Sequence, residues 1–371
     1  MSVSWIELDL RGLRRNLRAL KAGIPSGAKL MMSVKADAYG HGVADVATGA
    51  WAAGVKWFIV SSAAEGAAVR GHLPEARILI DGVASRSDVP AMTAERMAAV
   101  IHAPEQAQEL ARGAAASLCA GGAHGEIDTG FGQSGRDWES ARETLPRLAR
   151  LPGIKVQGVC SRFAVTGRPD DSFPSVQLAR FYTTVKVCRD SGMRMLFRHM
   201  ADDDAILRNL GLDMEGVRAG MLTYGYFPKH AGRPLDCRPF MEWKTRVLQV
   251  RDVPKGFSVG GVTSYATAAP TRLAVVAVGY ADGFPRRMNR GGHVLIHGRP
   301  CPVAGPVGME LTTVDAGDDR QVNPGDEVVL IGAHQDRTLW ADRLAAWCET
   351  TTPEILSGIR TNTRREIVRR M

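Results

Sequence analysis

The sequence predicts an α/β protein in which a TIM-like (β/α)8 barrel is followed by a mainly β domain. Over residues 1–225, short apolar runs alternate with Ala- and Leu-rich stretches of helical spacing. About eight such strand–helix units favour a parallel barrel covered by helices, with its chemistry at the carboxyl ends of the strands. After about residue 230, short strands separated by Gly and Pro replace the helical spacing. We therefore predict a barrel domain at residues 1–230 and a C-terminal β domain at residues 231–371.

Each expected strand is a short apolar run, and each expected helix repeats apolar residues at a spacing of three or four. Barrel strands are predicted at residues 29–34, 57–61, 77–80, 98–102, 117–120, 156–160 and 195–199. Helices between them are predicted at residues 44–53, 63–69, 104–114 and 177–189. In the second domain, strands are predicted at residues 243–250, 273–278, 293–296, 312–314 and 327–331, with a late helix at residues 339–347. The boundary is expected within residues 227–239, which are rich in Pro and Gly.

The composition predicts a cytoplasmic protein without a bound metal. The six cysteines show neither C-x-x-C spacing nor a nearby histidine cluster, so reduced thiols are the simplest interpretation. No apolar stretch is long enough to span a bilayer, and the first residues lack the pattern of a secretion signal. The net charge of +8 comes from arginines spread along the helices and the tail, without a basic patch interleaved with aromatic residues. We expect a solvated basic surface that favours acidic ligands, with neither a nucleic-acid nor a membrane partner.

Lys35 stands out because it ends the apolar run at residues 30–34 (LMMSV). An ammonium group at the inner end of a buried strand is costly, because burial disfavours the charged form. The free amine that burial favours is a nucleophile able to form a Schiff base. The alternative is a lysine whose long side chain reaches solvent from the strand end. The residues that follow Lys35 favour the first interpretation.

Residues 34–42 (VKADAYGHG) resemble the cofactor-lysine segment of the alanine racemase family, which are fold-type III enzymes that use pyridoxal 5′-phosphate (PLP). Four other segments resemble further motifs of this family, in the same order. They are residues 5–10 (WIELDL), 217–220 (VRAG), 264–265 (SY) and 279–287 (GYADGFPRR). The resemblance covers essentially the whole chain. It implies the two-domain fold, PLP as the cofactor, and an amino-acid racemase or a related isomerase.

The resemblance implies two catalytic residues, Lys35 and Tyr265. Racemisation removes an α-proton of very low acidity, and PLP helps by delocalising the carbanion. Two bases on opposite faces let the proton leave one side and return on the other. In the family, the cofactor lysine serves one face and a tyrosine of the partner subunit serves the other. A head-to-tail homodimer is therefore expected, because Tyr265 needs the barrel of a partner to face Lys35.

Cofactor contacts are implied at five further positions. The family's arginine at the position of Arg218 meets the pyridine nitrogen, which stays unprotonated because a guanidinium keeps its protons. His199 matches the histidine that supports this arginine. Tyr39 and the backbone of Gly220 and Met221 match parts of the phosphate cradle. For Arg218 and His199, the alternative is a structural charge pair at a strand end.

Substrate contacts are implied at Tyr280 and Met309. These residues match positions that line the substrate entrance and contact the substrate carboxylate. Packing is the alternative for both, above all for the methionine. An ordinary aromatic residue of the β domain is the alternative for Tyr265.

Five positions depart from the family pattern. The serine that donates to the PLP phosphate is replaced by Asp203, and a carboxylate ~4 Å from another full charge costs ~4 kcal/mol at an effective dielectric of ~20. A tyrosine that also contacts the phosphate aligns with Pro353. The histidine stacked on the pyridine aligns with Arg162, which can stack on a ring and could offset the charge of Asp203. The arginine near the cofactor O3′ and the substrate carboxylate becomes Gln133, and the often carbamylated lysine becomes Glu126.

Three accounts of this site remain open. In the first, PLP binds through Lys35 and a remodelled pocket accepts a substrate other than alanine. In the second, the barrel has been repurposed and takes a ligand without phosphate, while Lys35 and Tyr265 do other acid–base work. In the third, the chain is a catalytically silent binding or regulatory protein. We favour the first account, because the family's lysine, tyrosines, histidine and pyridine-contacting arginine occur together.

Overall fold

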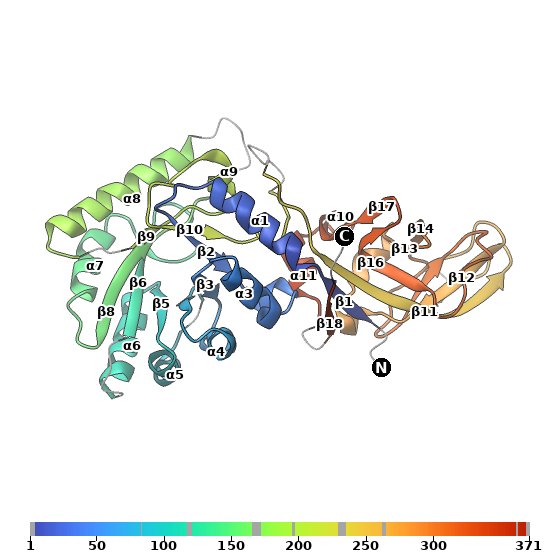
Figure 1. Cartoon of the computed structure of the whole chain (residues 1–371), viewed down its shortest axis with the longest axis horizontal. Coiled ribbons are helices and arrows are strands. Elements are labelled where there is room, and N and C mark those ends of the chain that lie inside the picture. Colours follow the sequence, from blue (N-terminus) through green and yellow to red (C-terminus); the bar gives the residue numbers. More distant parts are fainter. Residues whose placement is uncertain are drawn as a thin grey trace. The chain divides into compact units, whose positions relative to one another are not determined.

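The computed structural model describes residues 4–82, 84–116, 121–164, 172–194, 197–228, 235–261, 265–360 and 363–368. By its contacts the chain forms two compact units, both drawn in Figure 1. The barrel unit holds Leu13–Ala38 and Val43–Arg238, and the β unit holds Met1–Gly12, Tyr39–Gly42 and Pro239–Met371. The predicted division after residue 230 falls among residues 229–234, which lie outside the described residues, so this boundary stays a prediction.

Among the described residues, eight parallel strands of the barrel unit close into a ring. They are β2 (Lys29–Ser33), β3 (Trp57–Val60), β4 (Arg77–Ile80), β5 (Met97–Ile101), β6 (Gly121–Asp128), β8 (Ile154–Cys160), β9 (Arg198–His199) and β10 (Gly216–Ala219). Each pairs with the next, and β10 pairs back to β2 with Gly216 opposite Lys29. This ring confirms the predicted (β/α)8 barrel. The strand expected at residues 117–120, and the first two residues of the strand expected at 195–199, lie outside the described residues.

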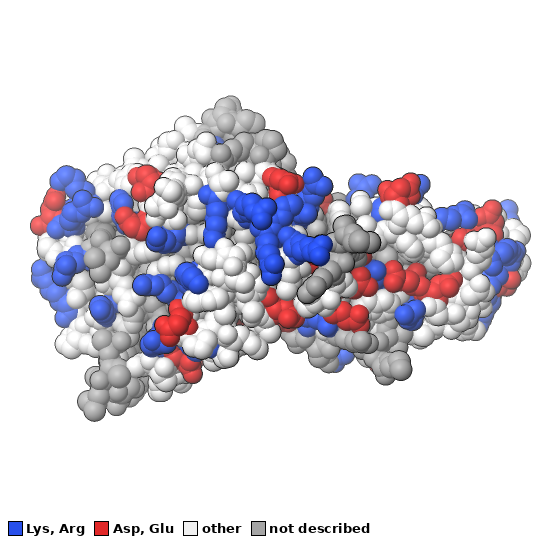
Figure 2. Space-filling view, viewed as in Figure 1, with Lys and Arg blue, Asp and Glu red and all other residues white. Residues whose placement is uncertain are grey.

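Helices lie around this ring (Figure 1). They are α1 (Leu10–Ala22), α3 (Val43–Ala52), α4 (Ala63–His72), α5 (Val89–Ala94), α6 (Pro104–Ala116), α7 (Ala141–Leu148), α8 (Phe173–Asp190) and α9 (Asp203–Arg208). In α1, Leu13, Leu17 and Leu20 are fully buried at helical spacing, while arginines on the other face are exposed. Figure 2 shows these basic side chains gathered over α1. No helix within the described ranges is both long and apolar enough to cross a membrane.

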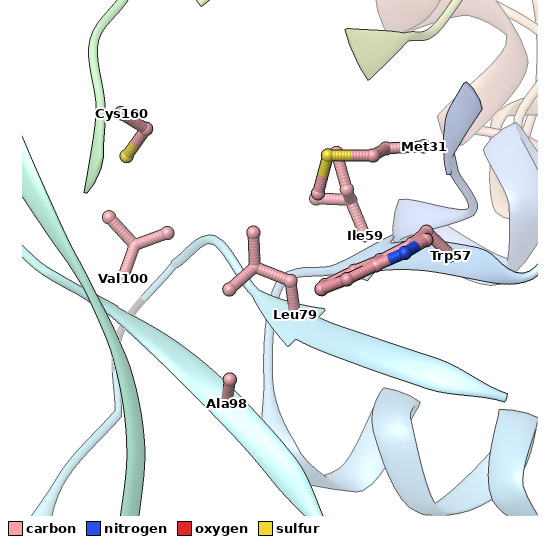
Figure 3. Close-up of a cluster of buried hydrophobic side chains, with 7 residues drawn as sticks. All are labelled: Met31, Trp57, Ile59, Leu79, Ala98, Val100 and Cys160. Atoms are coloured by element: carbon pink, nitrogen blue, oxygen red, sulfur yellow. The ribbon is translucent and has the colours of Figure 1, made fainter. Parts of the chain in front are cut away.

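A cluster of buried apolar side chains fills the inside of the barrel. Trp57 and Ile59 of β3, like Ala98 and Val100 of β5, are two residues apart and therefore point to the same side of their strand. Figure 3 shows these side chains facing those of Met31, Leu79 and Cys160 from other strands. The packed interior leaves the carboxyl ends of the strands, which we call the barrel mouth, as the place for chemistry.

The β unit contains a branched, mostly antiparallel sheet, which confirms the predicted mainly β domain. Its strands are β1 (Trp5–Leu8), β11 (Met241–Val253), β12 (Thr271–Val276), β13 (His293–Ile296), β14 (Arg299–Pro302), β15 (Thr312–Asp315), β16 (Glu327–His334), β17 (Arg337–Leu339) and β18 (Arg364–Ile367). Two short helices, α10 (Ala341–Trp347) and α11 (Thr352–Ser357), follow β17. Strand β1 lies between β11 and β18, where Ile6 and Leu8 are fully buried. The first strand of the chain is therefore an inner strand of the second sheet.

Candidate active site

The backbone after Lys35 forms one left-handed turn, α2 (Lys35–Tyr39). The φ angles of Ala36, Asp37, Ala38 and Tyr39 are 49°, 55°, 55° and 49°. Such left-handed conformations cost about 1–2 kcal/mol for each residue that carries a Cβ. Four in a row persist only where the surrounding structure fixes them, which is a feature typical of functional sites.

Glu65 at the start of α4 anchors this turn. Its two carboxylate oxygens accept the main-chain N–H groups of Ala36 at 2.8 Å and of Ser61 at 2.7 Å. Asp37 stabilises the other end by accepting the N–H of Val43 at 2.8 Å. Sequence reasoning missed Glu65, although it is the third residue after Ser62, the N-cap of α4. The turn and its anchors fix where the side chain of Lys35 begins.

The amine of Lys35 is bound to Asp81, the residue that follows β4. Lys35 Nζ donates to the Asp81 main-chain oxygen at 2.6 Å and lies 3.1 Å from Oδ2. The lysine side chain is about one quarter exposed, and that of Asp81 is only 3% exposed. Lys35 therefore does not extend into solvent as a free surface lysine.

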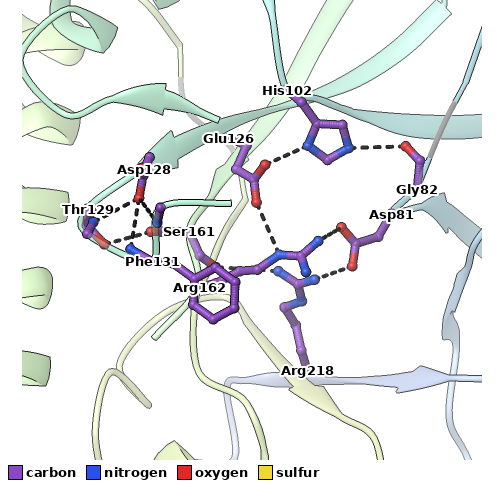
Figure 4. A network of polar contacts seen from close by, with 12 residues as sticks. Asp81, Gly82, His102, Glu126, Asp128, Thr129, Phe131, Ser161, Arg162 and Arg218 are labelled. Carbon is purple, nitrogen blue, oxygen red and sulfur yellow. Dashed lines mark hydrogen bonds and ion pairs between the residues drawn. The ribbon is translucent and has the colours of Figure 1, made fainter. Parts of the chain in front are cut away.

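Asp81 also binds two arginines at the barrel mouth (Figure 4). Arg162 donates to Oδ1 at 2.8 Å, and Arg218 donates to Oδ2 at 2.5 Å. Burial alone would raise the pKa of Asp81, but Arg218, Lys35 and Arg162 together hold it well below its ordinary range. One buried carboxylate thus neutralises part of the charge of three cations. Sequence reasoning missed Asp81, whose only local signal is its place directly after the predicted strand at residues 77–80.

The network continues from Arg162 to Glu126 and His102 (Figure 4). Arg162 Nε lies 3.2 Å from Glu126, whose other oxygen lies 2.5 Å from His102 Nδ1. The second ring nitrogen of His102 lies 3.1 Å from the oxygen of Gly82. The hydrogen bond to Glu126 raises the pKa of His102, against the opposing effect of burial. Glu126, predicted from the sequence, therefore serves as an anion between an arginine and a histidine.

His199 lies beside a second histidine, His124. The Nε2 atom of His199 and Nδ1 of His124 are 2.9 Å apart, and both rings are buried. Burial holds the pKa of His199 well below its ordinary value, and the nearby His124 and Arg218 add to this effect. A neutral His199 close to Arg218 is compatible with the supporting role that the resemblance implies, which stays a prediction.

Asp203 occupies a cradle of main-chain N–H groups. Its Oδ1 accepts from Gly220 at 3.0 Å, and its Oδ2 accepts from Leu222 at 3.4 Å. Burial raises the pKa of Asp203 to about 7, against the lowering effect of these N–H groups. Among the described residues, Arg162 forms its ion pairs with Asp81 and Glu126 and forms none with Asp203.

The remaining candidates lie elsewhere. Gln133 is exposed in the loop after β6. Met221 lies in the barrel unit, just after β10. The other candidates belong to the β unit, namely Tyr39, Tyr265, Tyr280, Met309 and Pro353. Tyr265 donates to Asp315 at 2.8 Å, and burial together with this carboxylate raises its pKa to about 12. Tyr280 and Met309 are exposed and their segments lie side by side, since the oxygen of Met309 accepts the N–H of Ala281 at 2.9 Å. The expected motif residue Ser264 lies outside the described residues.

Comparisons with known proteins agree with this architecture. The chain matches the N-terminal domain of alanine racemase over residues 8–228 and the C-terminal domain over residues 240–367. It is 35% identical to an alanine racemase of Symbiobacterium thermophilum, over 97% of this chain and 95% of that protein. It is 34% identical to one of Desulfosudis oleivorans, over 96% of this chain and 94% of the relative.

Solved structures share the whole fold. The alanine racemase of Clostridium difficile 630 superposes with a TM-score of 0.92 at 26% identity, covering 100% of this chain and 96% of that one. The alanine racemase of Streptomyces coelicolor A3(2) superposes with a TM-score of 0.89 at 31% identity, covering 99% of this chain and 98% of that one. A Bartonella henselae structure with covalently bound pyridoxal phosphate shares the fold at 24% identity, with a TM-score of 0.86 and coverage of 99% and 100%.

A parallel barrel with a lysine at its mouth, followed by a mainly β domain, defines the fold-type III class of PLP-dependent enzymes. Within that class, this chain belongs to the alanine racemase family. The family identified from the motifs is therefore confirmed. The matches also support the predicted kind of enzyme, an amino-acid racemase, and PLP as its cofactor.

Replacing Asp81 tests the network at the barrel mouth. We expect Asp81→Asn to lower the free energy of unfolding by about 3 kcal/mol near pH 7, because three cations lose their shared anion. Since the pKa of Asp81 is depressed in the folded state, this stabilisation exists above the unfolded pKa of about 4 and is lost as pH falls further. Urea unfolding at pH 7 and below pH 4 measures both effects.

The matched control is Asp236→Asn, which removes a carboxylate from an exposed pair with Arg238. Such surface pairs contribute about 0–1 kcal/mol. Equal stability of the two variants at pH 7 would show that the Asp81 network contributes nothing to folding.

Proposed function

We propose that this chain is a PLP-dependent amino-acid racemase that acts as a head-to-tail homodimer, with Lys35 and Tyr265 as its two bases. The observation that carries the proposal is the amine of Lys35, which a left-handed turn holds at the barrel mouth within 3.1 Å of Asp81. Backbone strain of this kind is maintained where a side chain needs a fixed position. A cytoplasmic location stays part of the prediction.

The barrel unit has residues suited to both the ring and the phosphate arm of PLP. Around the ring, Lys35 would link to the aldehyde carbon, and Arg218, which also binds Asp81, would meet the pyridine nitrogen on the opposite side. For the phosphate arm, the N–H groups of Gly220 and Leu222 already converge on an anion, so they suit a phosphate group. When bound, PLP supplies the electron sink for the α-carbanion. The other residues that we assign to the cofactor site are Tyr39, Arg162, His199, Asp203 and Met221.

In the proposed reaction, two side chains of this protein exchange the α-proton of the substrate. The amine of Lys35 takes or returns the α-proton on one face of the substrate. Tyr265 serves the other face, and with a pKa raised to about 12 it holds its proton at neutral pH and gives it to a strong base such as a carbanion. For Tyr265 to take up a proton, its pKa must fall, which requires a positive environment. The cations at the barrel mouth of a second copy would provide that environment, which is why we propose the homodimer.

We further propose that the substrate is an amino acid other than alanine. Gln133 offers a neutral amide where the family's arginine contacts the substrate carboxylate, so this carboxylate loses a charge-assisted hydrogen bond. The charge of Arg162 is already committed to two carboxylates. Tyr280 and Met309, which are both exposed, would line the substrate entrance.

A second candidate function is a repurposed barrel that does not use PLP. The observation that favours it is the carboxylate of Asp203, which accepts the N–H groups expected to bind the phosphate. Lys35 and Tyr265 would then serve different acid–base chemistry, or the pocket would bind a ligand without phosphate. The two candidates differ in whether PLP forms a covalent bond with Lys35.

The first test of the proposal is the absorbance band that PLP gains when it is bound to a lysine. We expect this band in the wild type with added PLP and its complete loss in Lys35→Ala, because no other amine replaces the nucleophile. Lys29→Ala is the matched control, since Lys29 is exposed at the opposite end of the same strand. A flat spectrum of the wild type at saturating PLP would favour the repurposed barrel.

The second test separates the two bases. We expect Tyr265→Phe to lower racemisation by about 10²–10⁴-fold, because one face loses its acid–base group. Lys35 should still exchange the α-proton of one enantiomer with solvent deuterium, which mass spectrometry of each enantiomer measures. Tyr182 lies on α8, and Tyr182→Phe, which removes a hydroxyl that donates to Asp213, should behave as the wild type. Deuterium exchange lost equally from both enantiomers would contradict the two-base assignment.

The third test concerns the substrate. In a panel of amino acids, we expect the wild type to racemise at least one with a kcat/KM about tenfold or more above that of alanine. Gln133→Arg should raise the value for alanine by about tenfold, because a charge-assisted hydrogen bond contributes about 1–2 kcal/mol more than a neutral one. Gln321→Arg adds the same charge at an exposed site of the β unit as a control. Alanine racemised far better than every other amino acid would exclude a different substrate.

A further inference from the structure

The main-chain N–H groups that we expect to bind the PLP phosphate already bind a carboxylate of this chain, that of Asp203. Asp203 is partly buried, and its two oxygens accept the N–H groups of Gly220 and Leu222 at 3.0 and 3.4 Å. The main-chain N–H of Met221 also lowers the pKa of this carboxylate. Three consecutive residues thus direct main-chain dipoles at one partly buried carboxylate, which is the arrangement of an anion-binding nest. A phosphate group that enters this nest meets the charge of Asp203.

The other groups near Asp203 do not neutralise it. Asp202, the N-cap of α9, adds a second negative charge that raises the pKa of Asp203. Cys237 also lies near it, with a thiol pKa raised to about 12, so the thiol is uncharged near neutral pH. Asp204 forms its own ion pair with Arg208 at 3.3 Å. Relief of the charge on Asp203 must therefore come from a proton.

This inference rests on the function proposed above. We propose that Asp203 is a phosphate-binding residue in its protonated form only, so that PLP enters the barrel together with one proton. The proton comes from solvent and binds one oxygen of Asp203, which then donates a hydrogen bond to a phosphate oxygen. The N–H groups of Gly220 and Leu222 pass from the carboxylate to the phosphate. A pyridoxal without phosphate leaves Asp203 on these N–H groups and takes up no proton there.

The sign of the pH dependence follows from the unliganded state. Burial raises the pKa of Asp203 to about 7, so below that value the residue is already protonated and above it a proton must be taken up. The affinity for PLP should therefore fall about tenfold for each pH unit above 7. Below pH 7, the protonation of Asp203 should no longer change this affinity. The cofactor's own ionisations act equally on all variants and cancel in a ratio of affinities.

The experiment is a PLP titration of the full chain between pH 6 and 9, followed by the absorbance of the Lys35-linked cofactor. Asp203→Ser and Asp203→Asn both supply a neutral hydrogen-bond donor, and two variants guard against one that fails to fold. We expect the affinity of each variant, divided by that of the wild type, to be level up to pH 7 and to rise about tenfold by pH 8 and about a hundredfold by pH 9. Asp204→Asn, which changes the neighbouring carboxylate, should give a ratio that is independent of pH. With pyridoxal, the ratio for Asp203→Ser should be independent of pH as well.

Two results would overturn the inference, and they are distinguishable. A ratio for PLP that does not change with pH in either Asp203 variant would show that no proton accompanies the phosphate, while the racemase proposal stands. The absence of a Lys35-dependent band from the wild type and from both variants at every pH would overturn the racemase proposal and this inference together.

Discussion

The barrel mouth depends on one interaction, the sharing of the Asp81 carboxylate among three cations. Lys35 follows β2, Arg162 follows β8 and Arg218 lies on β10, so three separate parts of the ring meet at a residue that follows β4. Without an anion between them, these cations would repel one another where little water can screen them. Arg162 extends the same network to Glu126, so the position of each charged group depends on the others.

Two different forces therefore fix the ends of Lys35. Its backbone is held in a left-handed turn by the carboxylate of Glu65, and its amine is held by Asp81. The turn costs free energy that local sequence does not repay, whereas the ion pair joins residues 46 positions apart in the chain. A side chain constrained at both ends loses little entropy when it reacts, which is a recognised source of rate in enzymes.

Elements that a local sequence pattern marks could be predicted from the sequence. Residues whose role depends on contacts with distant parts of the chain could not. The apolar run before Lys35 and the motif after it marked the strand, the lysine and the family. Asp81 carried no such mark, because its function comes from side chains that only the closed barrel brings to it. The left-handed turn was also missed, since its residues have no intrinsic preference for that conformation. Asp203 was recognised as a departure, but its bonds to the cradle depend on the fold of the β10 loop and could not be derived from composition.

The place of β1 in the second sheet affects how this sheet can fold. β1 (Trp5–Leu8) is hydrogen-bonded to β11 on one side and to β18 (Arg364–Ile367) on the other. β1 therefore completes its pairing only when two segments far from it in the sequence have come together. Until then this segment presents bare strand edges to other chains. Slow closure of this sheet during refolding would therefore favour association between chains through the open edges of β1.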